Sequence, residues 1–302
     1  MKALVTGGAG FIGSHLVDEL VRKKYKVIVL DNLSTGSLKN LKFVKNKIKF
    51  IKCDLSQKRN LTNLLHGVDY VFHLAGLSEV NASIKNPVKY YKANVIGTLN
   101  VLNSVRHIKL KKFIYSASAS CYGNPKEIPT SEKAKIQTLS PYASTKRISE
   151  KIILQHAKTQ GFPAISLRFF NVYGPRSKAS GPYSAVISIF AKQKLANKPL
   201  TVVGDGLQSR SFIYVSDVVE AMIKAAKSKI FNEIFNVGSQ KSLKIEEIAK
   251  MFKGKKIYIP KRTGDPKHSS ANINKIAKLL NWKPKISIKE GINILLKTAN
   301  KQ

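Results

Sequence analysis

A glycine-rich turn between an apolar strand and an amphipathic helix constrains the fold of this chain more than any other feature. Residues 3–6 form an apolar run, residues 7–13 read Gly-Gly-Ala-Gly-Phe-Ile-Gly, and apolar residues then recur at helical spacing. In the pattern Gly-x-Gly-x-x-Gly, which begins at Gly8, the glycines permit a tight turn and let the backbone approach a pyrophosphate at the helix N-terminus. The turn therefore predicts a dinucleotide site with cofactor contacts from Gly7, Gly10, Phe11, Ile12 and Gly13.

The residue that follows the second apolar run indicates which dinucleotide is bound. That run, residues 27–30, ends in Asp31, where a carboxylate can accept hydrogen bonds from the adenosine ribose hydroxyls. Its charge would repel a 2′-phosphate, so the sequence favours NAD over NADP. In the alternative interpretation, Asp31 and Asn32 only cap a helix or form a turn, but the strand–glycine–helix–strand–Asp order favours the cofactor interpretation.

A tyrosine and a lysine four residues apart form the second motif, Ser140-Pro141-Tyr142-Ala143-Ser144-Thr145-Lys146. Ser140 and Pro141 are typical of the N-cap and first position of a helix, so Tyr142 and Lys146 share one helix face about one turn apart. A free tyrosine ionises near pH 10, but a neighbouring ammonium and a positive nicotinamide ring both favour the phenolate. Tyr142 is thus a candidate base. In the alternative interpretation, Tyr142 and Lys146 are surface residues of an amphipathic helix. The glycine-rich motif favours the catalytic interpretation.

A third candidate follows the apolar strand at residues 113–116. Small hydroxyl residues come directly after it, at the carboxyl end of a sheet strand, where ligands bind in α/β folds. Ser118 is therefore the candidate that completes a catalytic group with Tyr142 and Lys146.

These motifs, in this order, resemble the extended short-chain dehydrogenase/reductase family, in particular its NAD-dependent nucleotide-sugar epimerases and dehydratases, typified by UDP-glucose 4-epimerase. The resemblance covers nearly the whole chain and implies a nucleotide-sugar substrate, UDP-linked in the members that the sequence resembles most. It implies further cofactor contacts at Asn32, Asp54, Leu55, Leu74, Ala75, Asn94, Tyr142, Lys146 and Phe169. It implies substrate contacts at Ser118, Asn171, Arg210, Arg262, Asp265 and Ser269.

Three places depart from the family pattern. Ser211 and Asn272 stand where the family usually has Asp, and Ser78 and Glu79 replace a lysine that often contacts the cofactor. We expect Ser211 and Asn272 to affect the support of the local structure more than the chemistry. We expect the change at Ser78 and Glu79 to affect the affinity for the cofactor.

Ala119 and Ser120 indicate which reaction of the family the chain carries out. The family's dehydratases have an Asp–Glu pair at these positions, and its decarboxylases commonly have a Glu. The resemblance therefore implies oxidation and re-reduction at C4, which is 4-epimerisation of UDP-glucose and UDP-galactose. The small Ser269 implies that UDP-GlcNAc and UDP-GalNAc are also admitted. Another dehydration, decarboxylation or epimerisation of the same family is the alternative.

The charge balance raises a second class of function. The chain has 53 Lys+Arg against 17 Asp+Glu, a formal net charge of +36, which is typical of nucleic-acid-binding proteins. The excess is nearly all lysine and is dispersed, which favours a proteome-wide bias over a specific nucleic-acid partner. A noncatalytic, nucleic-acid-binding member of the family is the alternative, but the Tyr–Lys pair is kept and no ribonucleoprotein motif is present.

Apolar strands alternate with helical stretches up to residue 172, which predicts an α/β fold with a Rossmann-type, doubly wound parallel sheet. The chain is expected to divide into an NAD-binding domain at residues 1–172, with a return to its sheet at about 212–238, and a smaller C-terminal α/β substrate lobe, mainly residues 173–302. The spacing of Cys and His predicts neither a disulfide nor a metal site.

The expected location is the cytoplasm. The first strand begins at about Lys2, and no apolar run approaches the length that spans a bilayer, so neither a signal peptide nor a membrane partner is predicted. The family resemblance implies a homodimer.

Overall fold

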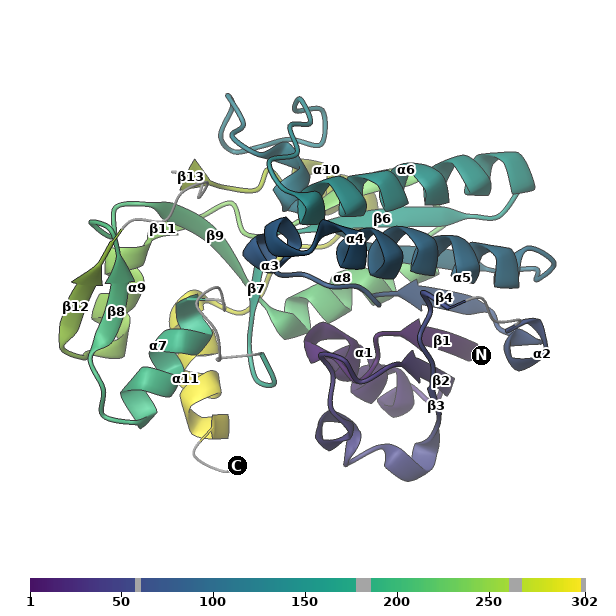
Figure 1. Ribbon diagram of the computed structural model, residues 1–302, viewed down its shortest axis with the longest axis horizontal. Helices are drawn as coiled ribbons and strands as arrows, with labels where there is room; N and C mark the ends of the chain where they lie inside the picture. The colour runs from purple at the N-terminus through teal and green to yellow at the C-terminus, as the bar shows by residue number, and fades with distance from the viewer. Residues whose placement is uncertain (58–60, 178–185, 261–267, 300–302) are drawn as a thin grey trace. The chain divides into compact units, whose positions relative to one another are not determined.

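The computed structural model describes residues 1–57, 61–177, 186–260 and 268–299. Its largest sheet has seven strands in the order β10-β6-β5-β4-β1-β2-β3, so the strand order reverses at β1 and β3 lies at one edge (Figure 1). The pairs β3–β2, β2–β1, β1–β4 and β4–β5 are all parallel. The predicted α/β class and doubly wound sheet are confirmed. The strands are β1 (Lys2–Thr6), β2 (Lys26–Asp31), β3 (Ile48–Lys52), β4 (Tyr70–His73), β5 (Lys112–Ser118), β6 (Ala164–Phe169) and β10 (Glu233–Val237).

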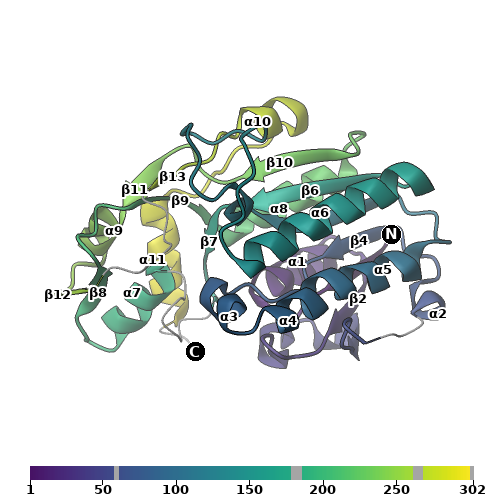
Figure 2. The same cartoon turned by 45° about the horizontal axis from the view of Figure 1, so that its top comes forward.

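Helices cover both faces of this sheet. Figures 1 and 2 show α5 and α6 side by side across one face, with α1 and α8 on the other. The helices and single turns of this region are α1 (Phe11–Arg22), η1 (Leu38–Leu41), η2 (Lys45–Lys47), α2 (Thr62–Leu65), α3 (Val80–Lys85), α4 (Pro87–Tyr90), η3 (Tyr91–Ile96), α5 (Gly97–Val105), η4 (Ala119–Tyr122), α6 (Pro141–Gln160) and α8 (Val215–Lys227).

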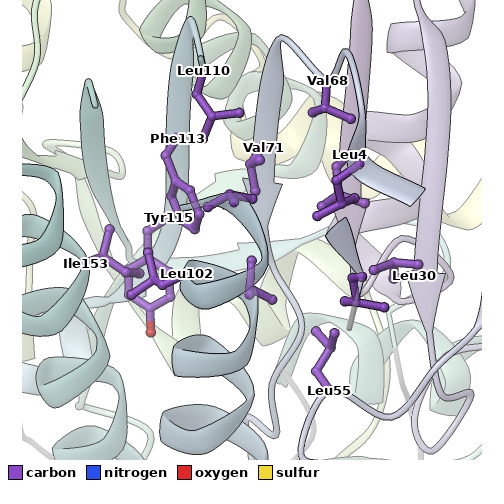
Figure 3. Close-up of a cluster of buried hydrophobic side chains, with 14 of the residues drawn as sticks. Leu4, Leu30, Leu55, Val68, Val71, Leu102, Leu110, Phe113, Tyr115 and Ile153 are labelled. Atoms are coloured by element: carbon purple, nitrogen blue, oxygen red, sulfur yellow. The ribbon is translucent and has the colours of Figure 1, made fainter. Parts of the chain in front are cut away.

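The hydrophobic core lies where these helices meet the sheet. Every residue of β4 is buried, as expected for a strand covered on both faces. In Figure 3, Phe113 and Tyr115 of β5 lie beside Leu102 of α5 and Ile153 of α6. Burying side chains of this size stabilises the fold by about 1.5–3 kcal/mol each. The same packing fixes α6 against β5.

Helix α6 begins where its sequence predicts. The Oγ of its N-cap, Ser140, accepts a hydrogen bond from the backbone N of Ala143 at 3.2 Å, and Pro141 occupies the first helical position. The helix ends at Gly161, whose φ of 70° lies in the left-handed region. The first turn of α6 therefore carries Tyr142, and the second carries Lys146.

Contacts divide the chain into two compact units. Unit 1 is formed by residues 1–121, 138–168 and 219–235, and unit 2 by residues 122–137, 169–218 and 236–302. The segment 122–137, which lies before the expected boundary at residue 172, thus belongs to unit 2. The reason is long-range bonding, since the Oη of Tyr122 donates to Oδ1 of Asn236 at 2.6 Å and the backbone N of Thr130 donates to the carbonyl of Ser270 at 2.8 Å.

Unit 2 contains two small sheets. One has the order β11-β9-β13, with β7 also pairing with β9, and the other pairs β12 with β8. Residues 212–214 therefore lie in β9 of this unit. Within the predicted return at about 212–238, the strand that joins the large sheet is β10. The elements are β7 (Asn171–Tyr173), α7 (Val186–Leu195), β8 (Leu200–Val203), β9 (Ser209–Tyr214), β11 (Ser242–Lys244), α9 (Ile245–Phe252), β12 (Lys256–Ile259), β13 (His268–Ser269), α10 (Asn274–Leu280) and α11 (Ile288–Ala299).

The core of unit 2 is built around aromatic side chains. Trp282 is 1% exposed, and its indole N–H donates to the carbonyl of Asp217 at 3.1 Å. Helix α9 buries Ile245, Ile248 and Phe252 at helical spacing. Across the described parts of the chain, no helix combines the length and apolar character needed to cross a membrane.

Candidate active site

The glycine turn has the geometry that a bound phosphate requires. Gly7 has a φ of +70°, and a Cβ there would lie 2.7 Å from the backbone N of Ala75. A Cβ on Gly13 would lie 2.2 Å from the carbonyl oxygen of Gly7, so a side chain there would force helix and turn apart. Helix α1 follows with Gly10 as its N-cap, without a side-chain cap and without an acidic residue in its first turn. The backbone N–H groups at the N-terminus of α1 are therefore available to bind an anion.

Asp31, the last residue of β2, is held in place by the backbone around it. Its Oδ2 accepts a hydrogen bond from the backbone N of Ala9 at 2.9 Å, and its Oδ1 accepts one from Leu33 at 2.8 Å. Each carboxylate oxygen can accept a further bond. The carboxylate therefore remains available to ribose hydroxyls while its position is fixed.

The next predicted cofactor contacts lie after β3. Asp54 accepts hydrogen bonds at Oδ1 from the backbone N and the hydroxyl of Ser56, at 2.9 and 2.7 Å. The Ser56 hydroxyl bond is the main cause that lowers the pKa of Asp54, with a further contribution from the side chain of Asn32. Leu55 is buried in the core. Phe169, at the end of β6, is also buried.

The loop after β4, which carries Leu74 and Ala75, rests on a buried hydrogen-bond chain. Nε2 of His73 lies 2.9 Å from Oγ1 of Thr98, and Nδ1 lies 2.7 Å from Oγ1 of Thr6. Because Thr98 donates its proton to the carbonyl of Asn94, it accepts from Nε2–H, and Nδ1 accepts from Thr6. Thr6 in turn accepts from the backbone N of Ala75 at 3.2 Å. The chain thus fixes the loop that faces the glycine turn.

Asn94 joins this loop to the catalytic helix. It lies in the π-helical turn η3, its Oδ1 accepts from the backbone N of Leu77 at 2.8 Å, and its Nδ2 donates to the Leu77 carbonyl at 3.0 Å. The second Nδ2 proton goes to Oγ1 of Thr145 on α6 at 2.9 Å. Both amide protons are used within the protein, so a cofactor contact from this side chain is left to Oδ1.

Ser118 and Tyr142 form the hydroxyl part of the site. Burial raises the pKa of Tyr142 above its ordinary value. The hydrogen bond from the Ser118 hydroxyl acts in the opposite direction but is the smaller effect. The Oγ of Ser118 accepts bonds from the backbone N and the hydroxyl of Ser120, at 3.2 and 2.9 Å. With both lone pairs taken up, the hydroxyl of Ser118 acts as a donor, and Tyr142 is the group that receives its proton.

Lys146 is buried one helical turn beyond Tyr142. Its Nζ lies 4.6 Å from the centre of the Tyr115 ring, and the side chain is 7% exposed. Burial lowers the pKa of Lys146 to about 7, and the negative charge of Glu150 acts in the opposite direction. The amine therefore titrates close to neutral pH instead of remaining a permanent cation.

A buried ion cluster anchors the helix that carries this lysine. Oε1 of Glu150 lies 2.7 Å from a guanidinium nitrogen of Arg168 on β6, and its Oε2 accepts from the hydroxyl of Ser166 at 2.8 Å. Arg147 contacts the same carboxylate. Burial is the largest single influence on the pKa of Glu150 and acts to raise it, but the hydrogen bonds from Arg168 and Ser166 and the charges of Arg168 and Arg147 together outweigh burial, so that pKa is lowered and the carboxylate stays ionised.

Three of the predicted substrate residues lie on the small sheet of unit 2. Asn171 on β7 stands opposite Phe212 of β9, and its Nδ2 donates to the carbonyl of Ser211 at 2.9 Å. Ser269 on β13 stands opposite Arg210 of β9. Parallel pairing thus brings Asn171, Arg210 and Ser269 onto adjacent strands. Arg262 and Asp265 lie outside the described residues.

Comparison with known proteins identifies the family. The profile of the NAD dependent epimerase/dehydratase family matches residues 3–238. The chain belongs to this family. A UDP-glucose 4-epimerase of Lactobacillus helveticus is 35% identical over 322 residues, covering 99% of this chain and 96% of that protein. The structure of UDP-glucose 4-epimerase from Thermotoga maritima, solved with UDP-glucose, has a TM-score of 0.95 at 35% identity and covers 100% of this chain and 99% of that one.

The family contains more than one reaction among its similar members. A UDP-N-acetyl-alpha-D-glucosaminuronate decarboxylase of Bacillus cytotoxicus is 33% identical over 309 residues, covering 96% of this chain and 95% of that protein. Membership of the NAD dependent epimerase/dehydratase family therefore establishes the cofactor but leaves the reaction to be argued from the site.

The residues of this epimerase/dehydratase-family chain fit NAD. The uncapped N-terminus of α1 suits a pyrophosphate, and the fixed carboxylate of Asp31 suits unphosphorylated ribose hydroxyls. Within the described residues, no group of three His, Cys, Asp or Glu side chains could hold a metal ion.

Several residues that shape the family site were not singled out in the sequence. Tyr115, Ser120, Thr6 and Thr98 act on the candidate residues through buried contacts between elements distant in the chain. The sequence indicates Ser120 only as a position without an acid. The one local signal for its bond to Ser118 is that its hydroxyl lies two residues further along the chain.

Two departures from the family pattern have a visible local role. Ser211 is completely buried, its Oγ donates to the carbonyl of Ser239 at 2.6 Å, and it accepts from the backbone N of Ser239 at 2.9 Å. Asn272 accepts at Oδ1 from the backbone N of Asn274 at 3.0 Å. Both side chains support loops of unit 2.

Proposed function

We propose that this protein is an NAD-dependent UDP-sugar 4-epimerase. The observation that carries the proposal is the grouping of Ser118, Tyr142 and Lys146 on β5 and α6, next to two positions without an acid. Family membership supports the nucleotide-sugar class, and the relatives named UDP-glucose 4-epimerase support the particular reaction.

The proton transfers follow from the arrangement of the hydroxyls. Tyr142 accepts the proton of the sugar C4 hydroxyl. Without substrate, Ser118 donates its one proton to Tyr142; with the sugar bound, Ser118, whose lone pairs are occupied by Ser120, would donate that proton to the oxygen at C4 instead. NAD, when bound, would supply a reversible hydride acceptor for C4, and inversion requires that the 4-keto sugar turn over between removal and return of that hydride. Tyr142 then gives its proton back, so the reaction is neutral in protons and electrons. Lys146, as an ammonium, favours the phenolate form of Tyr142.

Dehydration is disfavoured because the site offers no acid–base pair beside Ser118. Ala119 has no polar side-chain atom, and the hydroxyl of Ser120 is committed to Ser118. The neighbouring Cys121 is buried, and burial raises the pKa of its thiol to about 11, so it stays a neutral thiol. The available chemistry is therefore oxidation and re-reduction at one carbon.

We propose UDP-glucose/UDP-galactose as the first substrate pair and UDP-GlcNAc/UDP-GalNAc as the second. Ser269 supports the second pair, because a small side chain on β13 leaves space for an N-acetyl group. Arg210, on β9 next to β13, and Asn171, on β7, which also pairs with β9, are proposed to hold the diphosphate, since a planar guanidinium suits phosphate oxygens.

NMR of the sugar anomeric signals tests the proposed reaction. The protein is incubated with NAD and, in separate tubes, UDP-glucose, UDP-GlcNAc, UDP-glucuronate and dTDP-glucose. New galacto-configured signals establish 4-epimerisation and identify the sugar. Release of CO₂ from UDP-glucuronate, with formation of a pentose, would instead assign a decarboxylase reaction, the class of reaction for which the Bacillus cytotoxicus relative is named.

We also propose that the protein forms a homodimer. The three consecutive helical elements α3, α4 and η3 expose a series of apolar side chains: Val80, Ile84, Val88, Tyr91 and Ile96. Such a series on a helical surface is typical of a face that a second copy covers.

A further inference from the structure

The ring of Tyr115 occupies an unusual position beneath the catalytic lysine. It belongs to β5, three residues before Ser118, and is 1% exposed. Figure 3 shows it in the core beside Leu102 and Ile153. The Nζ of Lys146 lies over the ring at 4.6 Å from its centre.

The contact between Lys146 and the Tyr115 ring matters because few other groups near the lysine can stabilise its positive charge. In the parts of the chain that the structure describes, no carboxylate lies within ion-pair distance of Lys146. The closest acid along α6, Glu150, is shared by Arg168, Arg147 and Ser166. A buried ammonium without its own counter-ion is costly, and the negative face of an aromatic ring can offset part of that cost.

The other groups around the lysine do not supply a compensating charge. His73 of β4 stacks on Tyr115 with ring centres 5.7 Å apart, and burial lowers the pKa of His73 to about 3, so it is neutral. Burial likewise raises the pKa of Tyr115 well above its ordinary value, so its phenol is neutral. Tyr90 of α4 and Cys121 of η4 act on Tyr142 and not on the lysine.

We propose that Tyr115 is a positioning residue whose ring face keeps Lys146 in its ammonium form beside Tyr142. The inference rests on the proposed function, because the ammonium matters to the proton transfer of Tyr142. The hydroxyl of Tyr115 contacts the carbonyl of Lys146 at 3.4 Å and forms a hydrogen bond with Ser149, and neither contact brings a charged group to the lysine.

This distinction provides a matched pair of variants. Tyr115→Phe keeps the ring and removes the hydroxyl, whereas Tyr115→Leu keeps an apolar side chain and removes the π face. A desolvated cation–π contact is large enough to shift the pKa of Lys146 by about one unit. In Tyr115→Leu we expect that pKa to fall by about this amount, and in Tyr115→Phe to stay within a few tenths of the wild-type value.

Direct titration of the lysine is the first readout. Protein labelled with ¹³C at lysine Cε is titrated by NMR with NAD present, and the Lys146 signal is assigned by its loss in Lys146→Met. This readout does not depend on turnover, so it tests the inference even if the protein proves not to be an epimerase. Equal pKa values of Lys146 in wild type and folded Tyr115→Leu would overturn the proposal.

The pH dependence of kcat/KM is the second readout. Less ammonium near neutral pH destabilises the phenolate of Tyr142, so the ascending limb of the profile should move to higher pH by up to about one unit in Tyr115→Leu. Tyr115→Phe should restore the wild-type profile. A purely structural role would lower the stability of Tyr115→Leu and leave the profile in place, which would also overturn the proposal. Should Tyr115→Leu fail to fold, Tyr115→Met supplies the same comparison.

Discussion

At the scale of single residues, the site depends on which hydroxyl holds which proton. Tyr142 is the proposed acceptor of the substrate proton, because Ser118 is fixed as a donor by Ser120. Replacing Tyr142 by Phe should therefore lower kcat by roughly 10²–10⁴-fold while NAD binding is retained. Steady-state rates and NAD binding by calorimetry check this, with Ser144→Ala, on the same helix, as the control. Wild-type turnover in Tyr142→Phe would exclude it as the base.

Ser120 should influence the rate without touching the transferred proton. Removing its hydroxyl in Ser120→Ala frees a lone pair on Ser118, so the Ser118 proton is no longer directed to Tyr142 alone. We expect kcat to fall by roughly tenfold, since the loss corresponds to about one hydrogen bond. Ser120→Thr keeps the hydroxyl and should retain most of the rate. An unchanged kcat in Ser120→Ala would show that the bond between the two serines does not orient the donor.

Ser269 should govern which sugars are accepted. A bulky side chain in Ser269→Tyr would occupy the space proposed for the N-acetyl group, so kcat/KM for UDP-GlcNAc should fall at least tenfold relative to UDP-glucose. The comparison uses both substrates with the same enzyme preparation. Ser270→Ala, at the adjacent position, serves as the control. An unchanged preference would place the acetamido group elsewhere.

At the scale of elements, the sequence predicts features that depend on neighbouring residues, but not features that depend on contacts between distant parts of the chain. The cap and first turn of α6 were predicted because Ser140, Pro141 and the Tyr–Lys spacing act within a few residues. The π-helical turn η3 was not, because it depends on Asn94 bonding to Leu77 and to Thr145 of another helix. The candidate residues of unit 1 were found through motifs; the groups that orient them come from distant strands.

His73 ties β1, β4 and α5 together and should make stability depend on pH. Its folded pKa is lowered to about 3 by burial, whereas an unfolded His titrates near 6.5. The neutral ring therefore stabilises the fold fully above pH 6.5, and this contribution is lost progressively as pH falls toward about 3, because the unfolded chain then binds the proton more tightly.

The matching measurement is the free energy of unfolding by urea at several pH values. We expect wild type to lose more stability between pH 7 and pH 4 than His73→Gln, with a difference of roughly 1–4 kcal/mol. His156→Gln, at a partly exposed position on α6, should behave as wild type. Parallel pH dependences in wild type and His73→Gln would contradict this account.

At the scale of the whole molecule, the exposed apolar series on α3–η3 predicts self-association. Val88 and Ile84 are 62% and 57% exposed, which is unusual for apolar side chains this close together. Sedimentation at moderate salt should give a dimer for wild type and a monomer for Ile84→Glu/Val88→Glu. Leu207→Glu, an exposed apolar position on unit 2, is the control. A wild-type monomer would refute the proposed dimer.

The lysine excess has a consequence at the edge of the large sheet. Among the strands that the structure describes, β3 pairs on one side only, with β2, and its residues Lys49 and Lys52 are exposed, as are Lys45 and Lys47 just before it. Another chain that added a strand here would bring like charges together and strip water from each of them. These cations should thus protect the open edge from aggregation, and high salt, which screens them, is the condition in which that protection should weaken.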